Sequence, residues 1–480
     1  MPVHGSFGKG LATGGTRATW WYLGDTPSVI DRDACEFHTP KMATSNNILA
    51  IADPDGMASK AYTDPTIFEA EMERIFRRAW IFVGHESQVP NPGNFWRTWM
   101  GVDEVLLVRQ KCGDLKVLRN ACTHRGTRLC AEKSGSTNSF VCPYHSWGFD
   151  LDGALKAVPD MNGYPSDFDI TDRKLHLSSA PRVESYRGFV FASRAETGPS
   201  LAAFLGQMTD AIDNLVDRAP DGEIKIDGGS LRVRYPGNWK LHHENANDIV
   251  HPGFVHDSSV TSAKSADGGV VPNDSLIDRG QTKGMMISNG LTPKDWNAIE
   301  LTGTPEGHSF MGGFYKSGLL SPQQEDAVTR TYRKSLEAAH GKEKAATVLG
   351  MDRFNNLIWP TLNINAQFHQ IRVVHPISVS ETVIEGYCFR LGGAPDEIFH
   401  RAVRFLGTLV SPASMIFSDD LEIFGRVQRG LKNGSIERLN GQRGASTDMQ
   451  GMGARHSTTS SELPLRVQAA AWHNWMSVEP

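Results

Sequence analysis

The chain has 480 residues, of which 39% are hydrophobic and 21% charged, as in an ordinary globular protein. The formal net charge is −5 without a basic stripe, which argues against a nucleic-acid partner. No run of about 18 apolar residues occurs, so no membrane-spanning helix is expected. The N-terminus lacks the apolar core of a secretory signal, and we therefore expect a cytoplasmic protein.

The first 60 residues are rich in Gly, Thr, Ser and Pro, and we expect an extension there, with Met42 as an alternative start. Residues 64–80 then place apolar side chains mostly on one face of a helix. Asp64 is the expected N-cap and Pro65 the first-turn proline of that helix. Between about 81 and 195, short β-branched and aromatic runs alternate with turn residues, which predicts a small all-β domain.

From about 200 onward the patterns of helices and strands are mixed. Helices are expected at 201–217, 239–251, 396–409 and 419–430, and strands at 357–365, 370–374 and 382–391. Residues 257–325 are rich in Gly, Ser, Asp and Pro and predict a long loop region. The tail after 431 is polar and only weakly patterned.

Cysteine is too sparse for a disulfide framework, which would be denser and typical of a small secreted domain. The six cysteines are Cys35, Cys112, Cys122, Cys130, Cys142 and Cys388. Close pairs of Cys with His in a reducing compartment more often bind a metal.

Two such pairs occur, Cys122-x-His124 and, 17 residues later, Cys142-x-x-His145. Each pair lies between strand-like runs, so that two loops can clamp one centre. Zinc accepts this mixed set as well as iron does. Zinc fingers, however, usually pair Cys with Cys and His with His, whereas each loop here offers one of each. That arrangement favours a two-iron cluster, with thiolates on one iron and imidazoles on the other; Cys130 is then a buried thiol.

A second group of candidate ligands lies in residues 237–257. On one helix, Glu244, Asp248 and His251 would share a face, because they are spaced by four and three residues. Pro252 and Gly253 would end that helix and let His256 turn toward the same centre as His251.

Two His and one carboxylate form the facial triad of non-haem Fe(II) oxygenases, which leaves positions open for dioxygen. The downstream run 418–422 offers the carboxylate. Acidic residues at a helix start also commonly do no more than complement the helix dipole, which is the alternative interpretation.

The run C-T-H-R-G…C-P-Y-H-S-W-G-F-D resembles the Rieske motif of aromatic-ring-hydroxylating oxygenases, and the resemblance to their large (α) subunits covers roughly residues 60–430. It implies an α+β fold, in which a small all-β Rieske [2Fe–2S] domain joins a larger catalytic domain with an antiparallel sheet and covering helices. The expected parts are an N-terminal extension at 1–60, a helix packing on the catalytic domain at 61–82, the Rieske domain at 83–195 and the catalytic mononuclear iron domain at 196–480.

The resemblance also implies the roles of the site residues. Cluster ligands are Cys122, His124, Cys142 and His145. Mononuclear iron ligands are His251, His256 and Asp420, since the second acid of the family's acidic pair is the ligand and Glu422 and Gln428 follow at the family's spacing. The carboxylate of Asp248 joins the centres by accepting hydrogen bonds from His251 and from His145 of a neighbouring subunit. Adjacent residues of a helix point about 100° apart, so His242 and His243 are not expected to be a ligand pair, and we expect them to support the site or to lie on the surface. We expect His369 and His375 to lie in the core or at the edge of the pocket.

The implied function is that of a terminal oxygenase, which hydroxylates an aromatic substrate with dioxygen by cis-dihydroxylation or monohydroxylation. Electrons come from NAD(P)H through a separate reductase, with or without a ferredoxin, because the chain lacks both a dinucleotide-binding fingerprint and a plant-type cluster motif. They pass through His145, Asp248 and His251 between subunits of a homotrimer or an α3β3 assembly with small β subunits. Residues 240–247 look closest to α subunits that act on aromatic acids such as salicylate or benzoate.

Two rival functions remain open at this point. A Rieske electron-transfer protein without oxygenase activity would need only the first set of ligands and would leave residues 244–256 and Asp420 unexplained. A zinc-stabilised structural or binding protein would use the Cys and His pairs without any redox chemistry.

Overall fold

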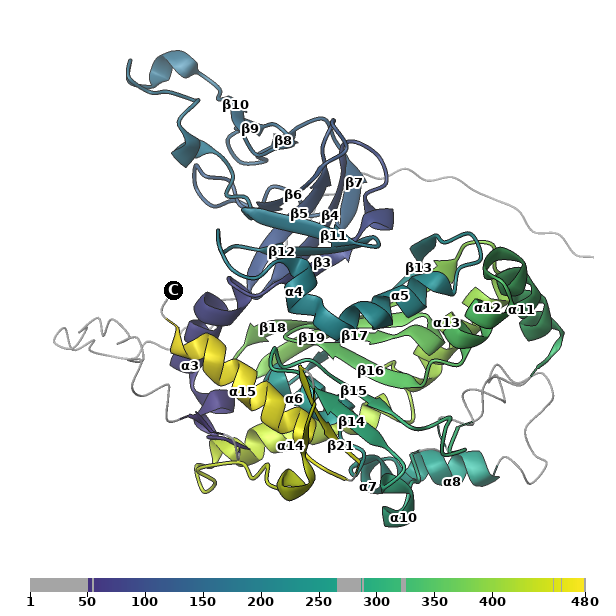
Figure 1. Ribbon diagram of the computed structural model, residues 1–480. Coiled ribbons are helices and arrows are strands. Elements are labelled where there is room, and N and C mark those ends of the chain that lie inside the picture. Colours follow the sequence, from purple (N-terminus) through teal and green to yellow (C-terminus); the bar gives the residue numbers. More distant parts are fainter. Residues whose placement is uncertain are drawn as a thin grey trace, which may run out of the picture. The chain divides into compact units, whose positions relative to one another are not determined.

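The structure, a computed structural model (Figure 1), describes residues 51–53, 56–265, 286, 289–320, 325–451, 453–458 and 460–478. The expectations for residues 1–50, including Met42 and Cys35, lie outside the described residues. The described residues belong to one compact unit. Within the described part, none of the helices combines the length and the apolar character needed to cross a membrane.

The described chain begins with a short hairpin and a helical segment. These elements are β1 (Ala52–Asp53), β2 (Gly56–Met57), α2 (Lys60–Thr63), α3 (Pro65–Glu71) and the π-helical turn η1 (Met72–Phe76). Asp64 caps α3 as predicted, because its side chain accepts a hydrogen bond from the Thr66 N–H at 2.9 Å and Pro65 opens the helix. Phe76 then packs edge-on against Trp239 with ring centroids 5.1 Å apart, which ties this segment to the larger domain.

The small β domain consists of three antiparallel sheets, in the strand orders β6-β5-β4-β7, β10-β9-β8 and β11-β12-β3. The strands are β3 (Ile81–His85), β4 (Asn94–Met100), β5 (Asp103–Arg109), β6 (Leu115–Arg119), β7 (Ser134–Ser136), β8 (Phe140–Val141), β9 (Gly148–Phe149), β10 (Leu155–Ala157), β11 (Arg182–Tyr186) and β12 (Phe189–Ser193). Leu106, Val108, Phe140 and Phe149 form a separate core with the cysteine-bearing loops. The predicted all-β domain is thereby confirmed.

The larger domain contains an antiparallel sheet of nine described strands in the order β13-β19-β18-β17-β16-β15-β14-β21-β20 (Figure 1). Its strands are β13 (Ile224–Tyr235), β14 (Glu300–Gly303), β15 (Ser309–Gly312), β16 (Arg353–Ile358), β17 (Leu362–Asn365), β18 (Gln370–Ser378), β19 (Glu381–Leu391), β20 (Met449–Gly451) and β21 (Ala454–Ser457). The predicted α+β class with an antiparallel catalytic sheet is confirmed.

Helices pack against this sheet, among them α5, α13, α14 and α15. The helices of the larger domain are α4 (Leu201–Leu205), α5 (Thr209–Asp217), α6 (Lys240–Ala246), α7 (Pro252–Val255), α8 (Asp257–Ser265), α10 (Pro293–Trp296), α11 (Ala327–His340), α12 (Lys342–Leu349), α13 (Asp396–Leu409), α14 (Phe417–Lys432) and α15 (Leu463–Ser477). The predicted helix at 396–409 is confirmed, and α14 encloses the one predicted at 419–430.

The single helix expected at 239–251 is wrong. Helix α6 ends at Ala246, and the chain turns before α7 begins at Pro252. The Asp248 carboxylate accepts the Val250 N–H at 2.8 Å, a local bond that competes with helix propagation. Glu244, Asp248 and His251 therefore do not share a helical face.

Three further expectations need correction. The helix at 201–217 is broken at Gly206, whose φ of 48° is unsuited to a helix. The region 257–325 contains α8, α10, β14 and β15, and the tail after 431 contains β20, β21 and α15. These strands are defined by pairing with distant partners, for example β14 with β21, which a local pattern does not reveal.

A buried ion pair joins the small β domain to the large sheet. The Lys133 ammonium lies 3.0 and 3.1 Å from the two Glu385 oxygens and 4.7 Å from the Trp96 ring centroid. Glu385 also accepts a hydrogen bond from the Tyr387 hydroxyl at 2.8 Å, and its side chain is 3% exposed. The carboxylate therefore satisfies donors from both domains.

Replacing Glu385 with alanine is expected to lower the free energy of unfolding by about 3–5 kcal/mol, because it leaves buried donors unpaired. Urea denaturation measures this. The matched control is Glu300→Ala, which breaks the exposed 3.1 Å pair with Lys316 and should change stability by no more than about 0.5 kcal/mol. Equal effects of the two substitutions would contradict a structural role of the buried pair.

Candidate metal centres

The two loops that carry the Cys and His pairs have the same backbone design. In each, the carbonyl of the Cys accepts a hydrogen bond from the N–H four residues on, Gly126 after Cys122 (2.8 Å) and Ser146 after Cys142 (2.9 Å). Both donors have positive φ, 72° and 54°. This tight turn points the ligand-type side chains of each loop to one side of it.

The four side chains of these loops come together. The rings of His124 and His145 lie 4.7 Å apart, and each Nδ1 is buried without a hydrogen-bond partner among the described atoms. Cys122 and Cys142 are buried free thiols in contact with each other. Two thiols and two unpaired imidazole nitrogens are the donor set of a Rieske [2Fe–2S] cluster, so the residues fit that group.

The surroundings of the sulfurs also fit. Burial opposes ionisation of the Cys142 thiol, but the backbone N–H groups of His145 and Tyr144 donate to its sulfur and lower its pKa. Trp147 stacks on the His124 ring at 4.8 Å and covers that side. Cys130 is a buried thiol as predicted, and burial raises its pKa to about 11.

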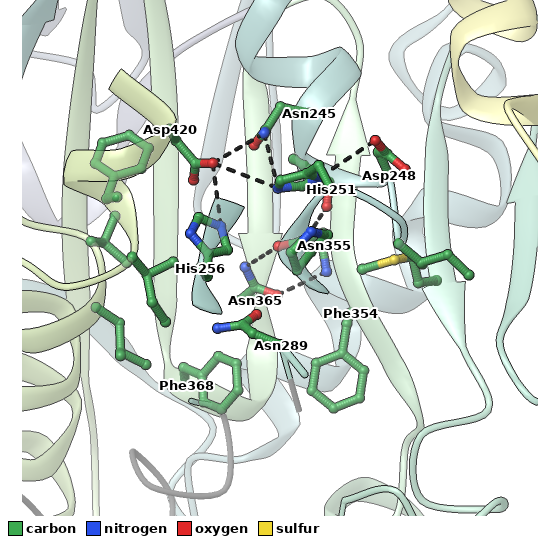
Figure 2. Close-up of a pocket in the computed structure, with 18 of the residues that line it drawn as sticks. Asn245, Asp248, His251, His256, Asn289, Phe354, Asn355, Asn365, Phe368 and Asp420 are labelled. Atoms are coloured by element: carbon green, nitrogen blue, oxygen red, sulfur yellow. Dashed lines mark hydrogen bonds and ion pairs between the residues drawn. The ribbon is translucent and has the colours of Figure 1, made fainter. Parts of the chain in front are cut away.

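A second centre is formed by His251, His256 and Asp420, whose donor atoms lie within 4.8 Å of one another (Figure 2). The histidines stand directly before and after α7, and Asp420 lies in the first turn of α14. Asp420 Oδ1 is 3.5 Å from His251 Nε2 and 3.4 Å from His256 Nε2. Ligands bound at about 2 Å to one ion lie roughly 3–3.5 Å apart, so this geometry fits a single metal ion.

The electrostatics of this centre are those of a cation site. Burial would raise the pKa of Asp420, but hydrogen bonds from His251 and His256 hold it well below its usual range. Burial lowers the pKa of His251, yet the carboxylates of Asp248 and Asp420 outweigh it and raise the pKa to about 9. A divalent cation would replace that proton and leave a neutral imidazole as the ligand.

Two further side chains, those of Asp419 and Asn245, lie next to the three residues of this centre. Asp419 Oδ2 is 3.5 Å from His256 Nδ1, the nitrogen opposite the one that faces Asp420. The Asn245 amide is 3.0 Å from His251 Nε2 and 3.1 Å from Asp420 Oδ1 (Figure 2). The sequence offered no signal for Asn245 beyond its place beside Glu244.

Two residues of the family's acidic pattern do not reach the centre. Glu422 is exposed and pairs with Arg426 at 2.9 Å. Gln428 is buried and donates to the backbone carbonyl of Tyr62, so it supports the packing of α14 on the N-terminal segment.

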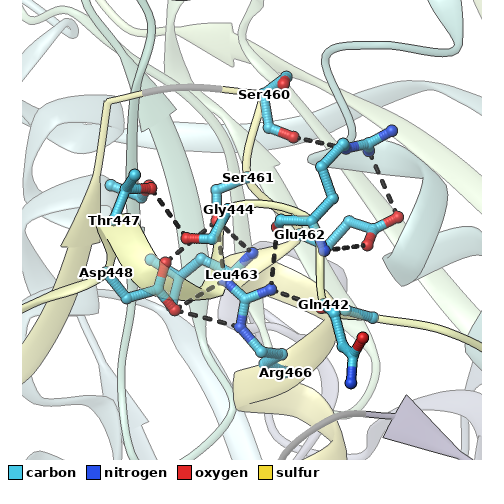
Figure 3. Close-up of polar contacts among 12 residues, drawn as sticks. Gln442, Gly444, Thr447, Asp448, Ser460, Ser461, Glu462, Leu463 and Arg466 are labelled. Atoms are coloured by element: carbon cyan, nitrogen blue, oxygen red, sulfur yellow. Dashed lines mark hydrogen bonds and ion pairs between the residues drawn. The ribbon is translucent and has the colours of Figure 1, made fainter.

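Asp248 lies on the outer side of the centre, with its side chain 33% exposed. Its Oδ2 is 3.5 Å from His251 Nδ1 and its Oδ1 is 3.5 Å from Arg443 Nη2. Arg443 is anchored in turn by the Ser460 carbonyl at 2.7 Å and the Glu462 carboxylate at 3.4 Å; Figure 3 labels these two partners, Ser460 and Glu462. The Asp248 carboxylate is therefore held between a site imidazole and a fixed guanidinium.

A cavity of about 160 Å³ adjoins the second centre. Its apolar wall includes Met311, Phe314, Phe354, Phe368 and Phe405, and its polar wall includes Asn355, Asn365 and Arg372. An apolar cavity of about 150 Å³ holds one benzene molecule, so this one suits a single aromatic ring. The wall supplied by β16–β18 could not be foreseen, because strand pairing brings it there.

The remaining candidate histidines lie in the core. His242, His243, His369 and His375 are buried and none lines the cavity. Burial lowers the pKa of His243 and of His369 to about 3, so both rings are neutral. A surface position for His242 and His243 is thus excluded.

Comparisons with known proteins agree with this geometry. Residues 79–181 match the Rieske [2Fe-2S] domain, and residues 219–476 match the ring hydroxylating alpha subunit (catalytic domain). The chain is 32% identical over 387 residues to the 2-halobenzoate 1,2-dioxygenase large subunit of Burkholderia cepacia, which covers 80% of this chain and 79% of that one. It is also 32% identical over 394 residues to toluate 1,2-dioxygenase subunit alpha of Pseudomonas putida, with 81% and 82% covered.

A structure of naphthalene 1,2-dioxygenase shares the fold, with a TM-score of 0.75 at 24% identity over 91% of this chain and 96% of that one. A [2Fe–2S] domain joined to a mononuclear iron domain defines a Rieske non-haem iron oxygenase. This chain belongs to the ring-hydroxylating oxygenase α subunits. It is a terminal oxygenase that carries a Rieske cluster and a mononuclear iron, and the electron-carrier interpretation is not favoured. Such oxygenases work with a separate electron donor and small aromatic substrates.

Proposed function

We propose that this chain hydroxylates a single-ring aromatic compound at the iron held by His251, His256 and Asp420. The observation that carries the proposal is the position of these three residues on the wall of a cavity of single-ring size. Cys122, His124, Cys142 and His145 hold the cluster.

The bound cluster supplies electrons one at a time, and the mononuclear iron supplies the activation of dioxygen. The protein's own contribution is positional. Phe354 and Phe368 contact a ring from the apolar wall of the cavity. The Asn245 amide would restrain Asp420 by donating to its Oδ1, while the lone pair of His251 Nε2 would go to the iron. Asp419 would orient His256 through its outer nitrogen.

Asp248 connects the two centres across a subunit boundary in this proposal. No contact joins Asp248 to His145 among the described residues, so the bridge requires a second copy of the chain. The loop beside the cluster suits docking, since Tyr144 is 60% exposed and His145 half-buried. A ring of three chains satisfies every such contact, either as a homotrimer or as α3β3 with small β subunits. We place this assembly in the cytoplasm, with an NAD(P)H-dependent reductase and, in some arrangements, a ferredoxin.

Replacing Asp248 with alanine is expected to leave the cluster spectrum and the iron content unchanged and to reduce product formation about 100-fold or more. The reason is that the carboxylate orients the imidazoles of both centres without binding either iron. Reoxidation of the reduced cluster in the presence of dioxygen and substrate should slow to the same extent as product formation. The control is Glu422→Ala, which removes an exposed carboxylate that pairs with Arg426. Normal turnover by the Asp248 variant would refute the bridging role.

Product analysis tests the proposed function as a whole. The purified oxygenase, a reductase and NADH are incubated with a panel of aromatic acids and hydrocarbons, and products are separated by chromatography. Oxygenated single-ring products are expected. Oxidation of NADH without any oxygenated product from the panel would favour a Rieske electron carrier instead.

A further inference from the structure

Arg372 introduces an unpaired positive charge into the wall of the cavity. It lies on β18, lines the cavity and is half-buried. Its one side-chain hydrogen bond among the described residues runs from Nη2 to Asn355 Oδ1 at 2.9 Å, and it forms no ion pair with them. A guanidinium offers five N–H donors, so most of its hydrogen-bonding capacity remains unused.

The charge persists at neutral pH. Burial lowers the pKa of Arg372 and the Asp420 carboxylate raises it, with a result of about 10. A charge kept away from bulk water without a partner is costly, and an anion that enters the cavity would relieve that cost.

The amide that contacts the guanidinium, Asn355, is itself held by Asn365. The Asn355 N–H donates to Asn365 Oδ1 at 2.8 Å, and Asn365 Nδ2 donates to Asn355 Oδ1 at 2.9 Å. Asn355 Nδ2 is itself bound to the Ala246 carbonyl at 2.6 Å. Figure 2 shows both amides between the candidate iron ligands and the rings of Phe354 and Phe368. Asn355, Asn365 and Arg372 thus form a rigid polar corner that faces an aromatic wall.

Building on the proposed function, we infer that the polar corner binds the carboxylate of a monocyclic aromatic acid. Arg372 pairs with the carboxylate, and the second N–H of the Asn365 amide donates to it. The ring then rests against Phe354 and Phe368 beside the iron ligands. Two similar enzymes, named for 2-halobenzoate and toluate, act on acids of this class, which supports the assignment.

An alternative role for Arg372 is to balance the negative charge of the Asp420 carboxylate. The two roles make different demands on the substrate. If Arg372 anchors a carboxylate, removing its charge weakens the binding of benzoate but not that of benzamide, the neutral isostere of benzoate. If Arg372 instead balances the charge of Asp420, removing its charge weakens the binding of both compounds equally and lowers the iron content.

The decisive experiment compares the wild-type holoenzyme with Arg372→Gln, using benzoate and benzamide as probes. Calorimetry measures the Kd of each, and turnover with a reductase measures the KM. The anchor role predicts that Kd and KM for benzoate rise about 100-fold, whereas those for benzamide change less than about threefold and the iron content stays constant. Asn365→Leu should raise the Kd for benzoate about tenfold, and the exposed Arg426→Gln is the control.

Two outcomes would overturn the inference. One is an equal loss for benzoate and benzamide in Arg372→Gln accompanied by loss of iron, which assigns Arg372 to Asp420. The other is a wild-type enzyme that binds benzoate no better than benzamide. In that second case, hydroxylation of a neutral ring would leave the proposed function intact and refute the carboxylate anchor alone.

Discussion

Replacing Asp420 with alanine is expected to remove the mononuclear iron and abolish product formation, while the visible absorption of the [2Fe–2S] cluster stays intact. Oδ1 of Asp420 faces the Nε2 atoms of both His251 and His256, and it is the one carboxylate oxygen within 3.5 Å of both among the described residues. Its loss leaves two neutral imidazoles, which hold a divalent ion far more weakly than the full triad does. Iron analysis and the visible spectrum measure the two centres separately.

The matched control for this substitution is Asp419→Asn. Asp419 neighbours the outer nitrogen of His256 at 3.5 Å, so the variant should retain iron. Loss of iron in Asp419→Asn with retention in Asp420→Ala would reverse the assignment of the ligand.

Replacing Cys142 with serine is expected to have an equally large effect on the other centre. The cluster and its colour should disappear, and turnover with a reductase should fall below detection, because the hydroxyl is a much poorer ligand for iron than a thiolate. The mononuclear iron should remain, since its proposed ligands flank α7 or lie in α14 of the larger domain. Visible absorption and acid-labile sulfide follow the cluster.

Cys130→Ser provides the control inside the same domain core. Cys130 is also buried, but burial raises its pKa to about 11, and it belongs to neither of the two Cys–His pairs. The variant should keep the full cluster spectrum. A colourless Cys130 variant together with a coloured Cys142 variant would show that the ligands have been wrongly assigned.

The two centres differ in how far the sequence predicts them. Cys122, His124, Cys142 and His145 belong to two short loops, so their proximity follows from spacing alone. Asp420 lies more than 160 residues from His256, and its choice over Asp419 depended on family resemblance. The structure places Asp420 against both Nε2 atoms and Asp419 against an outer nitrogen, which distinguishes them by geometry.

Other features were beyond local patterns. The proposed helical face of Glu244, Asp248 and His251 is wrong, because the Asp248 side chain bonds to the Val250 N–H and helps the chain to turn. Asn365 and Arg372 alternate with core residues in β17 and β18 and carry no motif. They lie on the adjacent strands β17 and β18, and the packing of these strands against the distant segments of His251, His256 and Asp420 forms the cavity.

A single-turnover experiment shows whether the two iron centres of this chain act together as an oxygenase. The assembled oxygenase is reduced chemically, freed of reductant and mixed with labelled dioxygen and a panel of single-ring aromatic acids. We expect the cluster to reoxidise as a hydroxylated product bearing the label appears. Reoxidation without labelled product from any compound, or a colourless protein that contains zinc and no acid-labile sulfide, would contradict it.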